Sequence, residues 1–406
     1  MYLLRMASYL SHVAVLMLSL SCSSGASSKP DAAEEFCDLN TAADEPNPDV
    51  VYNVDVVYDV LLRDPTSDPN YGIHIPFLFA DPEGVTAFTE SSLVRTSLGG
   101  TVTSTNSYDN RRLEKAVETD TGFAATFSRP NSQDAPILCT IPRHEPIDFN
   151  ACTSVSSHRF AWLSPYYYFL EFTSEVPPLW AAITVLNEAK EVVHHSNVLR
   201  LDARADLLFL TGIDTIEGKL VVHSNRSDEF YCYIPTFASL SPLGPEGSLL
   251  AAEFTDALPS GYTMSGFFTE TAGNDRSAFS YRAEVCVNAQ FACTPSRDAH
   301  VLSIFDGKSV VTRELANWPG QIHPISGGFT KLHVQDDPMG VDGFYSLHMF
   351  DLQARPTGKA IWPTEPFVGI LDYNMAEISQ GDIVVAFSIS GIAPQDRLMR
   401  IRLSSN

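Results

Sequence analysis

The residues with the clearest chemical potential are the seven cysteines: Cys22, Cys37, Cys139, Cys152, Cys232, Cys286 and Cys293. Cys22 ends an apolar run and precedes small residues, so its thiol is a candidate for lipid attachment. If Cys22 is modified, the other six form an even set that suits disulfides in an oxidising compartment. Short spacing favours Cys139 with Cys152 and Cys286 with Cys293, which leaves Cys37 with Cys232. The alternative for each is a buried free thiol.

An acidic loop is a candidate cation site. The segment HVQDDPMGVDG brings Asp336, Asp337 and Asp342 close to the tip of an expected hairpin. Ca²⁺ takes six to eight oxygen ligands, and such loops supply them. The alternative is that Asp, Pro and Gly are present only because turns use these residues. The sequence therefore indicates no cofactor other than a candidate Ca²⁺ ion at this loop.

An aromatic run is a candidate binding surface. In WLSPYYYFLEF, Tyr166 and Tyr168 lie on one face of an expected strand, and Trp162 and Trp180 are near in sequence. Flat rings stack on sugars and on partner side chains, so this group would bind carbohydrate or protein. The alternative is a strand that is buried on both faces beneath neighbouring elements.

Local signatures of covalent or metal catalysis are missing from the sequence. We find no G-x-S-x-G, no S-x-x-K followed by K-T-G, and no H-E-x-x-H. The sequence therefore favours a non-enzymatic role and identifies no catalytic residue. A hydrolase that uses dispersed acidic residues would carry none of these local motifs. Paired carboxylates in an aromatic cleft would indicate such an enzyme.

We expect the first residues to form an export signal. Arg5 is the only charged side chain before Cys22, and Val13 to Leu20 is almost wholly apolar. With Ser19-Leu20-Ser21-Cys22, this segment resembles a bacterial lipoprotein signal, and the resemblance implies a diacylglycerol thioether on Cys22. An ordinary cut near Ala26 and an uncleaved anchor are the alternatives. The polar, Pro-containing segment that follows is expected to be a tether.

Composition places the folded body among extracellular β proteins. The chain has 406 residues, of which 44% are hydrophobic and 18% charged, with 26 Pro and 23 Gly. Its formal net charge of −23 makes nucleic acid an unlikely partner, because phosphate binding needs clustered Lys and Arg. We expect the cell envelope as its location, lipid-anchored to the outer membrane or secreted.

Alternating apolar and polar residues predict strands throughout. VYNVDVVYDVLL (51–62), KLVVHS with EFYCYI, and FTKLHV with FYSLHMF are the clearest segments. NRRLEKAVE (110–118) is the one segment expected to form helical turns. The fold class is therefore all-β.

Weak self-similarity suggests tandem domains. YFLEFTSEVPP aligns with LLAAEFTDALPS and more loosely with VVAFSISGIAP. FTDALPSGYTMSGFF and ISGIAPQDRLMRIRL resemble the corner between the fifth and sixth strands of fibronectin type III and immunoglobulin-like modules. This resemblance implies tandem sandwiches, with Tyr262 in the place of the corner tyrosine. An irregular β-sandwich or a β-propeller is the alternative.

The expected organisation has six parts: signal peptide 1–21, tether 22–50, and β domains 51–130, 131–212, 213–300 and 301–406. We expect a surface or periplasmic lipoprotein whose β domains bind a partner, adhere or act as a spacer. A secreted hydrolase of polysaccharide or peptide is one alternative, and a structural component of an envelope assembly is another.

Overall fold

A computed structural model describes residues 50–62, 77–89, 91–130, 132, 134–172, 180–200, 210–227, 233–244, 253–258, 262–272, 276–285, 299–315, 322–336, 343–364, 369–390 and 395–405. The chain divides into two compact units, Met1–Asp38 and Leu39–Asn406, and every described residue belongs to the second. In that described part the only helix is the 3-10 helix η1 (Phe149–Ala151). No helix among those residues is long and apolar enough to span a bilayer.

The strands form a repeated unit of four, which we call a blade, with each strand antiparallel to the next. Blade 1 consists of β2 (Phe77–Asp81), β3 (Gly84–Phe88), β4 (Ser92–Thr96) and β5 (Val102–Ser107). Blade 2 consists of β6 (Arg112–Thr119), β7 (Gly122–Ser128), β8 (Ile137–Pro142) and β9 (Thr153–Ser154). Blade 3 consists of β10 (Phe160–Leu163), β11 (Tyr166–Phe172), β12 (Trp180–Leu186) and β13 (Val192–Arg200).

The next two blades repeat the pattern. Blade 4 consists of β14 (Leu210–Ile216), β15 (Lys219–Ser227), β16 (Tyr233–Leu240) and β17 (Glu253–Asp256). Blade 5 consists of β18 (Tyr262–Ala272), β19 (Ser277–Val285), β20 (Ala299–Phe305) and β21 (Val310–Leu315).

The remaining strands form one eight-stranded sheet that divides into two blades. Blade 6 consists of β22 (Ile322–Ile325), β23 (Gly328–Asp336), β24 (Gly343–Asp351) and β25 (Pro356–Thr364). Blade 7 consists of β26 (Gly369–Ser379), β27 (Asp382–Ser390), β28 (Gln395–Ser405) and β1 (Val51–Leu61). A short parallel contact between β1 and β25 joins the two halves. The first described strand therefore completes the last blade.

Turn chemistry explains where the strands reverse. Between β14 and β15, Glu217 and Gly218 both have positive φ, of 47° and 74°. Two such residues in succession form the hairpin turn whose twist matches the flanking strands. The expected helical segment 110–118 is instead mostly β6, because it pairs with the buried strand β7. Tertiary pairing overrides local helix propensity at this position.

Hydrophobic cores lie between consecutive blades. Phe88 and Phe123 meet between blades 1 and 2, and Phe237 stacks on Phe305 between blades 4 and 5 at 4.7 Å. Equivalent clusters lie between blades 2 and 3, 3 and 4, 5 and 6, 6 and 7, and 7 and 1. A blade is therefore covered on both faces, which explains why many strands are apolar without strict alternation.

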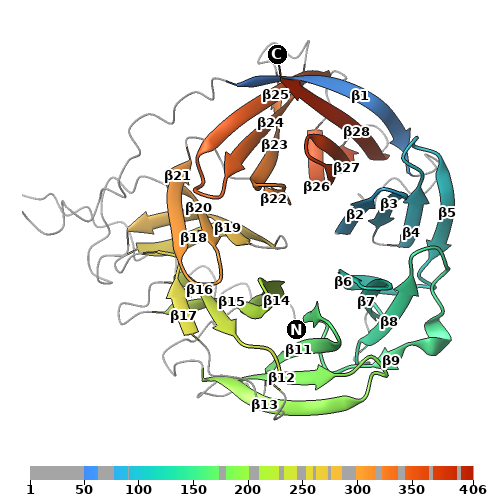
Figure 1. Cartoon of the computed structure of the whole chain (residues 1–406), viewed down its shortest axis with the longest axis vertical. Helices are drawn as coiled ribbons and strands as arrows, with labels where there is room; N and C mark the ends of the chain where they lie inside the picture. The colour runs from blue at the N-terminus through green and yellow to red at the C-terminus, as the bar shows by residue number, and fades with distance from the viewer. Residues whose placement is uncertain are drawn as a thin grey trace, which may run out of the picture. The chain divides into compact units, whose positions relative to one another are not determined.

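The first strands of the blades contact one another in a closed series (Figure 1). The successive contacts are β2 with β6, β6 with β10, β10 with β14, β14 with β18, β18 with β22, β22 with β26, and β26 with β2. A closed ring of seven four-stranded blades in the described part is a β-propeller. All-β is confirmed, and the structure favours the propeller alternative over tandem immunoglobulin-like sandwiches.

The aligned repeats fall on strands with different places in the blade. Glu171 and Phe172 end β11, the second strand of blade 3, whereas Glu253 and Phe254 begin β17, the fourth strand of blade 4. The expected domain ranges 51–130, 131–212, 213–300 and 301–406 all lie within one compact unit. The physical repeat is the shorter blade, because a single blade cannot bury its two apolar faces without neighbours.

Candidate functional site

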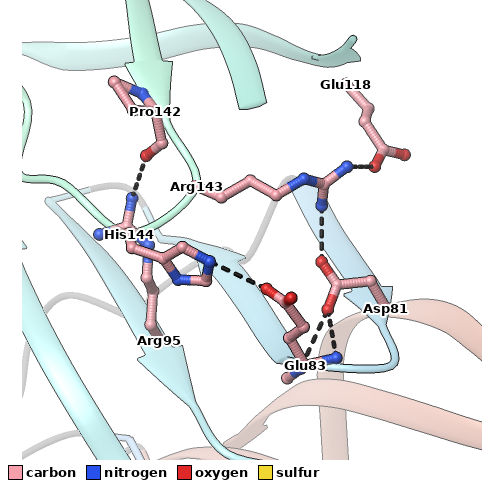
Figure 2. A network of polar contacts seen from close by, with 8 residues as sticks. Asp81, Glu83, Arg95, Glu118, Pro142, Arg143 and His144 are labelled. Carbon is pink, nitrogen blue, oxygen red and sulfur yellow. Dashed lines mark hydrogen bonds and ion pairs between the residues drawn. The ribbon is translucent and has the colours of Figure 1, made fainter. Parts of the chain in front are cut away.

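A polar network joins blades 1 and 2 (Figure 2). Arg143 follows β8 and reaches Asp81, at the end of β2, with 2.6 Å between Nη1 and Oδ2. Its Nη2 donates to Glu118 in β6. One guanidinium thus binds a carboxylate from each blade, and this arrangement fixes the connection after β8 against blade 1.

The turn after β2 presents Asp81 in the required orientation. Asp81 Oδ1 accepts hydrogen bonds from the backbone N–H groups of Glu83 at 2.7 Å and Gly84 at 3.0 Å. This is the pattern by which Asp stabilises a tight turn. The other carboxylate oxygen remains directed at Arg143, so one side chain both builds the turn and binds the cation.

Two further contacts complete the network. Arg95 Nη2 donates to the carbonyl of Pro142 at 3.1 Å, and His144 Nε2 lies 2.9 Å from Glu83 Oε2 (Figure 2). The hydrogen bond to Glu118 raises the pKa of Arg143. Its guanidinium also lies 5.6 Å from the ring centre of Phe123. These partners engage the positive charge, so Arg143 is a structural anchor rather than a group free to bind substrate.

A disulfide closes the loop that carries Arg143 and His144. Cys139 and Cys152, 13 residues apart, are bonded, with their Cα atoms 4.5 Å apart. Inside the loop, Asp148 caps η1 by accepting from Asn150 N at 2.9 Å. Lys190 of blade 3 donates to the Ala151 carbonyl at 2.9 Å. The loop is thereby held to blades 1, 2 and 3, and the bond is consistent with the pairing expected from spacing.

A chain of polar side chains, partly buried at Lys115 and Asp214 and fully buried at His223 and Ser277, links blades 2, 4 and 5. Lys115 Nζ donates to Asp214 Oδ1 at 3.1 Å, and Asp214 Oδ2 lies 3.8 Å from His223 Nδ1. His223 Nε2 is 2.7 Å from Ser277 Oγ. The order Asp, His, Ser is that of a hydrolytic triad. Both His223 and Ser277 are 0% exposed, however, so no acyl substrate reaches the hydroxyl in this structure.

The expected aromatic surface is divided between two interfaces. Tyr168 is 1% exposed and packs with Tyr166 against blade 4, and its hydroxyl accepts from Leu243 N at 3.3 Å. Trp162 packs with Tyr167 on the blade 2 side, with ring centres 4.5 Å apart. Trp180 begins β12, and its side chain lies outside the description. The alternative weighed from sequence, a strand covered on both faces, fits this geometry.

The other predicted site residues lie mostly outside the described part. Asp336 ends β23, and its side chain is not described; Asp337 and Asp342 lie outside the described residues. The same holds for Cys22, Cys37, Cys232, Cys286 and Cys293. Among the residues that the structure does describe, no three His, Cys, Asp or Glu side chains gather in a way that could hold a metal ion.

The Arg143 network escaped sequence reasoning. The segment DPEG (81–84) carries a turn signal, but nothing local relates it to Arg143, which is 62 residues away. Charged residues are common in turns, so the presence of these residue types did not predict an ion-pair network. Only the stacking of blades 1 and 2 brings these side chains together.

No protein-family model and no curated protein matches this sequence. The WD40 domain of Neurospora crassa Pan2 has a similar fold: the TM-score is 0.51 at 10% identity, over 85% of this chain and 95% of that one. Prolyl oligopeptidase B from Galerina marginata matches with a TM-score of 0.47 at 10% identity, over 82% of this chain and 50% of that one. A subtype N10 neuraminidase-like protein of A/little yellow-shouldered bat/Guatemala matches with a TM-score of 0.43 at 8% identity, over 73% of this chain and 96% of that one.

At such identities a structural match shows the fold alone. The WD40 match supports the β-propeller architecture that the strand contacts define. A β-domain with a binding or structural role is consistent with that architecture, and nothing more specific follows from the comparisons.

Proposed function

We propose that this chain is an exported protein, attached to a membrane by lipid on Cys22, whose propeller is a rigid non-catalytic module that binds another envelope protein. The observation that carries the proposal is the Cys139–Cys152 disulfide. Disulfides persist in oxidising compartments outside the cytosol and are rare within it. The disulfide therefore supports export independently of the N-terminal sequence.

The disulfide-closed loop 143–151 is the proposed contact surface. His144, Glu145 and Asp148 are exposed on it. The loop is already held by Asp81, Lys190 and the disulfide. A surface that is ordered before binding loses little conformational freedom on association. The carboxylates of this loop suit a partner surface rich in Lys or Arg.

The geometry favours a protein partner over carbohydrate. A sugar platform needs exposed rings, whereas Tyr168 is buried and Trp162 faces a different blade. Electrostatic complementarity mainly sets association rate and specificity, so salt should weaken binding to a basic partner. A spacer role would need the same lipid anchor and the same rigid propeller. It would not need a partner that contacts the loop 143–151.

The anchor is tested by metabolic labelling with a fatty acid in cells that express the wild type or Cys22→Ala. We expect label on the wild-type chain, its loss in Cys22→Ala, and release of that variant from membranes. Equal labelling of both chains contradicts the anchor. Mass spectrometry of the mature N-terminus distinguishes a cut before Cys22 from one near Ala26.

The contact surface is tested with a photo-crosslinking residue at position 145 in intact cells. Position 353, exposed in the β24–β25 turn of blade 6, is the matched control. We expect one discrete protein adduct at position 145 and none at position 353. Identical adducts at both positions, or no adduct at either, would contradict partner binding at this loop. The spacer role would then be the remaining proposal.

A further inference from the structure

The N-terminal end of β1 is hydrogen-bonded on both edges. On one edge it pairs with β28 in antiparallel fashion, beginning with Tyr52 opposite Ser405. On the other it pairs with β25 in parallel, with Val51 opposite Lys359 and Tyr52 opposite Ala360. The backbone N–H of Lys359 also donates to the carbonyl of Val50 at 3.0 Å. The outermost strand of an ordinary blade has a partner on one edge alone, as β13 does with β12 among the described strands.

Side-chain packing reinforces this double pairing. Tyr52 packs on the core between blades 6 and 7, together with Val54. Its ring lies directly over Gly358 of β25, where an added Cβ would stand only 2.5 Å from Tyr52 Cε2. Position 358 accepts no side chain without displacing that ring. The glycine therefore permits the close approach of β25 and Tyr52.

The C-terminal part of β1 packs against blade 1, which is the other neighbour of blade 7. A bulge between Val56 and Tyr58 shifts the register of β1 on β28. Beyond the bulge, Tyr58 and Val60 pack against the core between blades 7 and 1. One strand thus contacts blades 6, 7 and 1, and its loss would open the ring at two interfaces. Figure 1 shows β1 running from β25 along β28 toward blade 1.

We propose that the paired start of β1 is a mechanical clamp through which tension from the N-terminal tether enters the propeller. A force at Val50 directed along β1 loads the β28 hydrogen bonds together, whereas a sideways force would open them one after another. The bonds to β25 lie where such opening would begin, so they block it. This inference deepens the anchoring role proposed above and rests on it for its biological meaning. The mechanical property itself does not require a lipid on Cys22.

The test is single-molecule force spectroscopy on the chain from residue 22 onward, pulled through its N-terminus against a handle inserted at position 132 of blade 2. The clamp variants are Lys359→Pro, which removes the N–H that bonds Val50, and Tyr52→Ala. Tyr166→Ala is the matched control, because it removes a partly buried tyrosine from blade 3. We expect a high-force first event in the wild type and the control, and loss of that event in both clamp variants.

A first event at the same force in the clamp variants would overturn the proposal, as would a wild-type chain in which blade 7 opens at low force. If the variants do not fold, hydrogen exchange on the wild type decides. The Lys359 amide must then be among the slowest to exchange, and rapid exchange contradicts the clamp. Failure of acyl labelling would remove only the lipid anchor, since the force measurement is made without lipid.

Discussion

The ring of Tyr58 lies so close to Gly100 that a Cβ atom at position 100 would stand 2.7 Å from Tyr58 Cγ. Gly100 follows β4 in blade 1, and Tyr58 lies on β1 in blade 7. The contact therefore joins blade 7 to blade 1, where the ring of blades closes. Gly100 also has a φ of 83°, a region that residues with a side chain seldom adopt.

Gly100→Ala should destabilise the fold through both backbone strain and collision with Tyr58, by about 2–4 kcal/mol in the free energy of unfolding. Gly218→Ala is the control, because Gly218 has a φ of 74° but nothing within 4 Å of an added Cβ. Urea denaturation of both variants isolates the collision. Equal losses would show that the closeness of Tyr58 has no energetic consequence.

Arg143→Ala should lower the free energy of unfolding by about 1–3 kcal/mol, because it leaves two carboxylates without their cation at a partly buried junction. Arg129→Ala is the matched control: Arg129 also pairs with an aspartate, at 3.7 Å, but both side chains are more than 60% exposed. Exposed pairs contribute little. A double-mutant cycle with Asp81→Asn measures the coupling, and a coupling near zero would contradict the anchoring role of Arg143.

His323 should make stability depend on pH below neutrality. Burial lowers its pKa to about 3, and Nε2 has no hydrogen-bond partner among the described residues. The unfolded chain binds a proton near pH 6.5, whereas the folded chain does not until about pH 3, so stability falls as pH falls between these values. The contribution of this group at pH 5 is about 2 kcal/mol of lost stability relative to pH 7.5.

His323→Phe should flatten that part of the profile. The measurement is urea denaturation at pH 7.5, 6 and 5 for the wild type and the variant. Parallel profiles would mean that His323 does not carry the dependence. Because only the difference between the two curves is interpreted, other titrating groups cancel.

Removal of the Cys139–Cys152 disulfide should cost about 3 kcal/mol, since the bond joins two cysteines that are 13 positions apart in the sequence. The measurement is the Tm of Cys139→Ala with Cys152→Ala against the wild type, both under oxidising conditions. β9 spans only two residues, so the disulfide takes over part of the role of an outer strand. An unchanged Tm, or free thiols on Cys139 and Cys152 in the purified wild type, would contradict this view.

Sequence patterns predicted the local features well. The alternation in 51–62 predicted β1, and the hairpin of FTKLHV with FYSLHMF corresponds to β23 and β24. The short spacing of Cys139 and Cys152 anticipated the bond that closes one loop. Each of these features depends on residues that are near in sequence, so side-chain alternation and turn chemistry suffice to indicate it.

Higher-order organisation could not be read in the same way. The Glu-Phe-Thr alignment paired strands with different places in their blades, because an apolar strand before a turn looks similar wherever it lies. The aromatic run was divided between two interfaces for a related reason. A strand shows which residues share a face, but only its neighbours decide whether that face is covered.

The sequence by itself determined an all-β chain with hairpins. The export segment at the N-terminus stays a prediction. Tertiary structure decided that the strands form a closed ring and that Arg143 meets Asp81. It also decided that β1 completes the last blade, hundreds of residues away in the chain. The physical reason is that closure depends on pairing between strands and packing between blade faces, and neither leaves a local signature in the order of the residues.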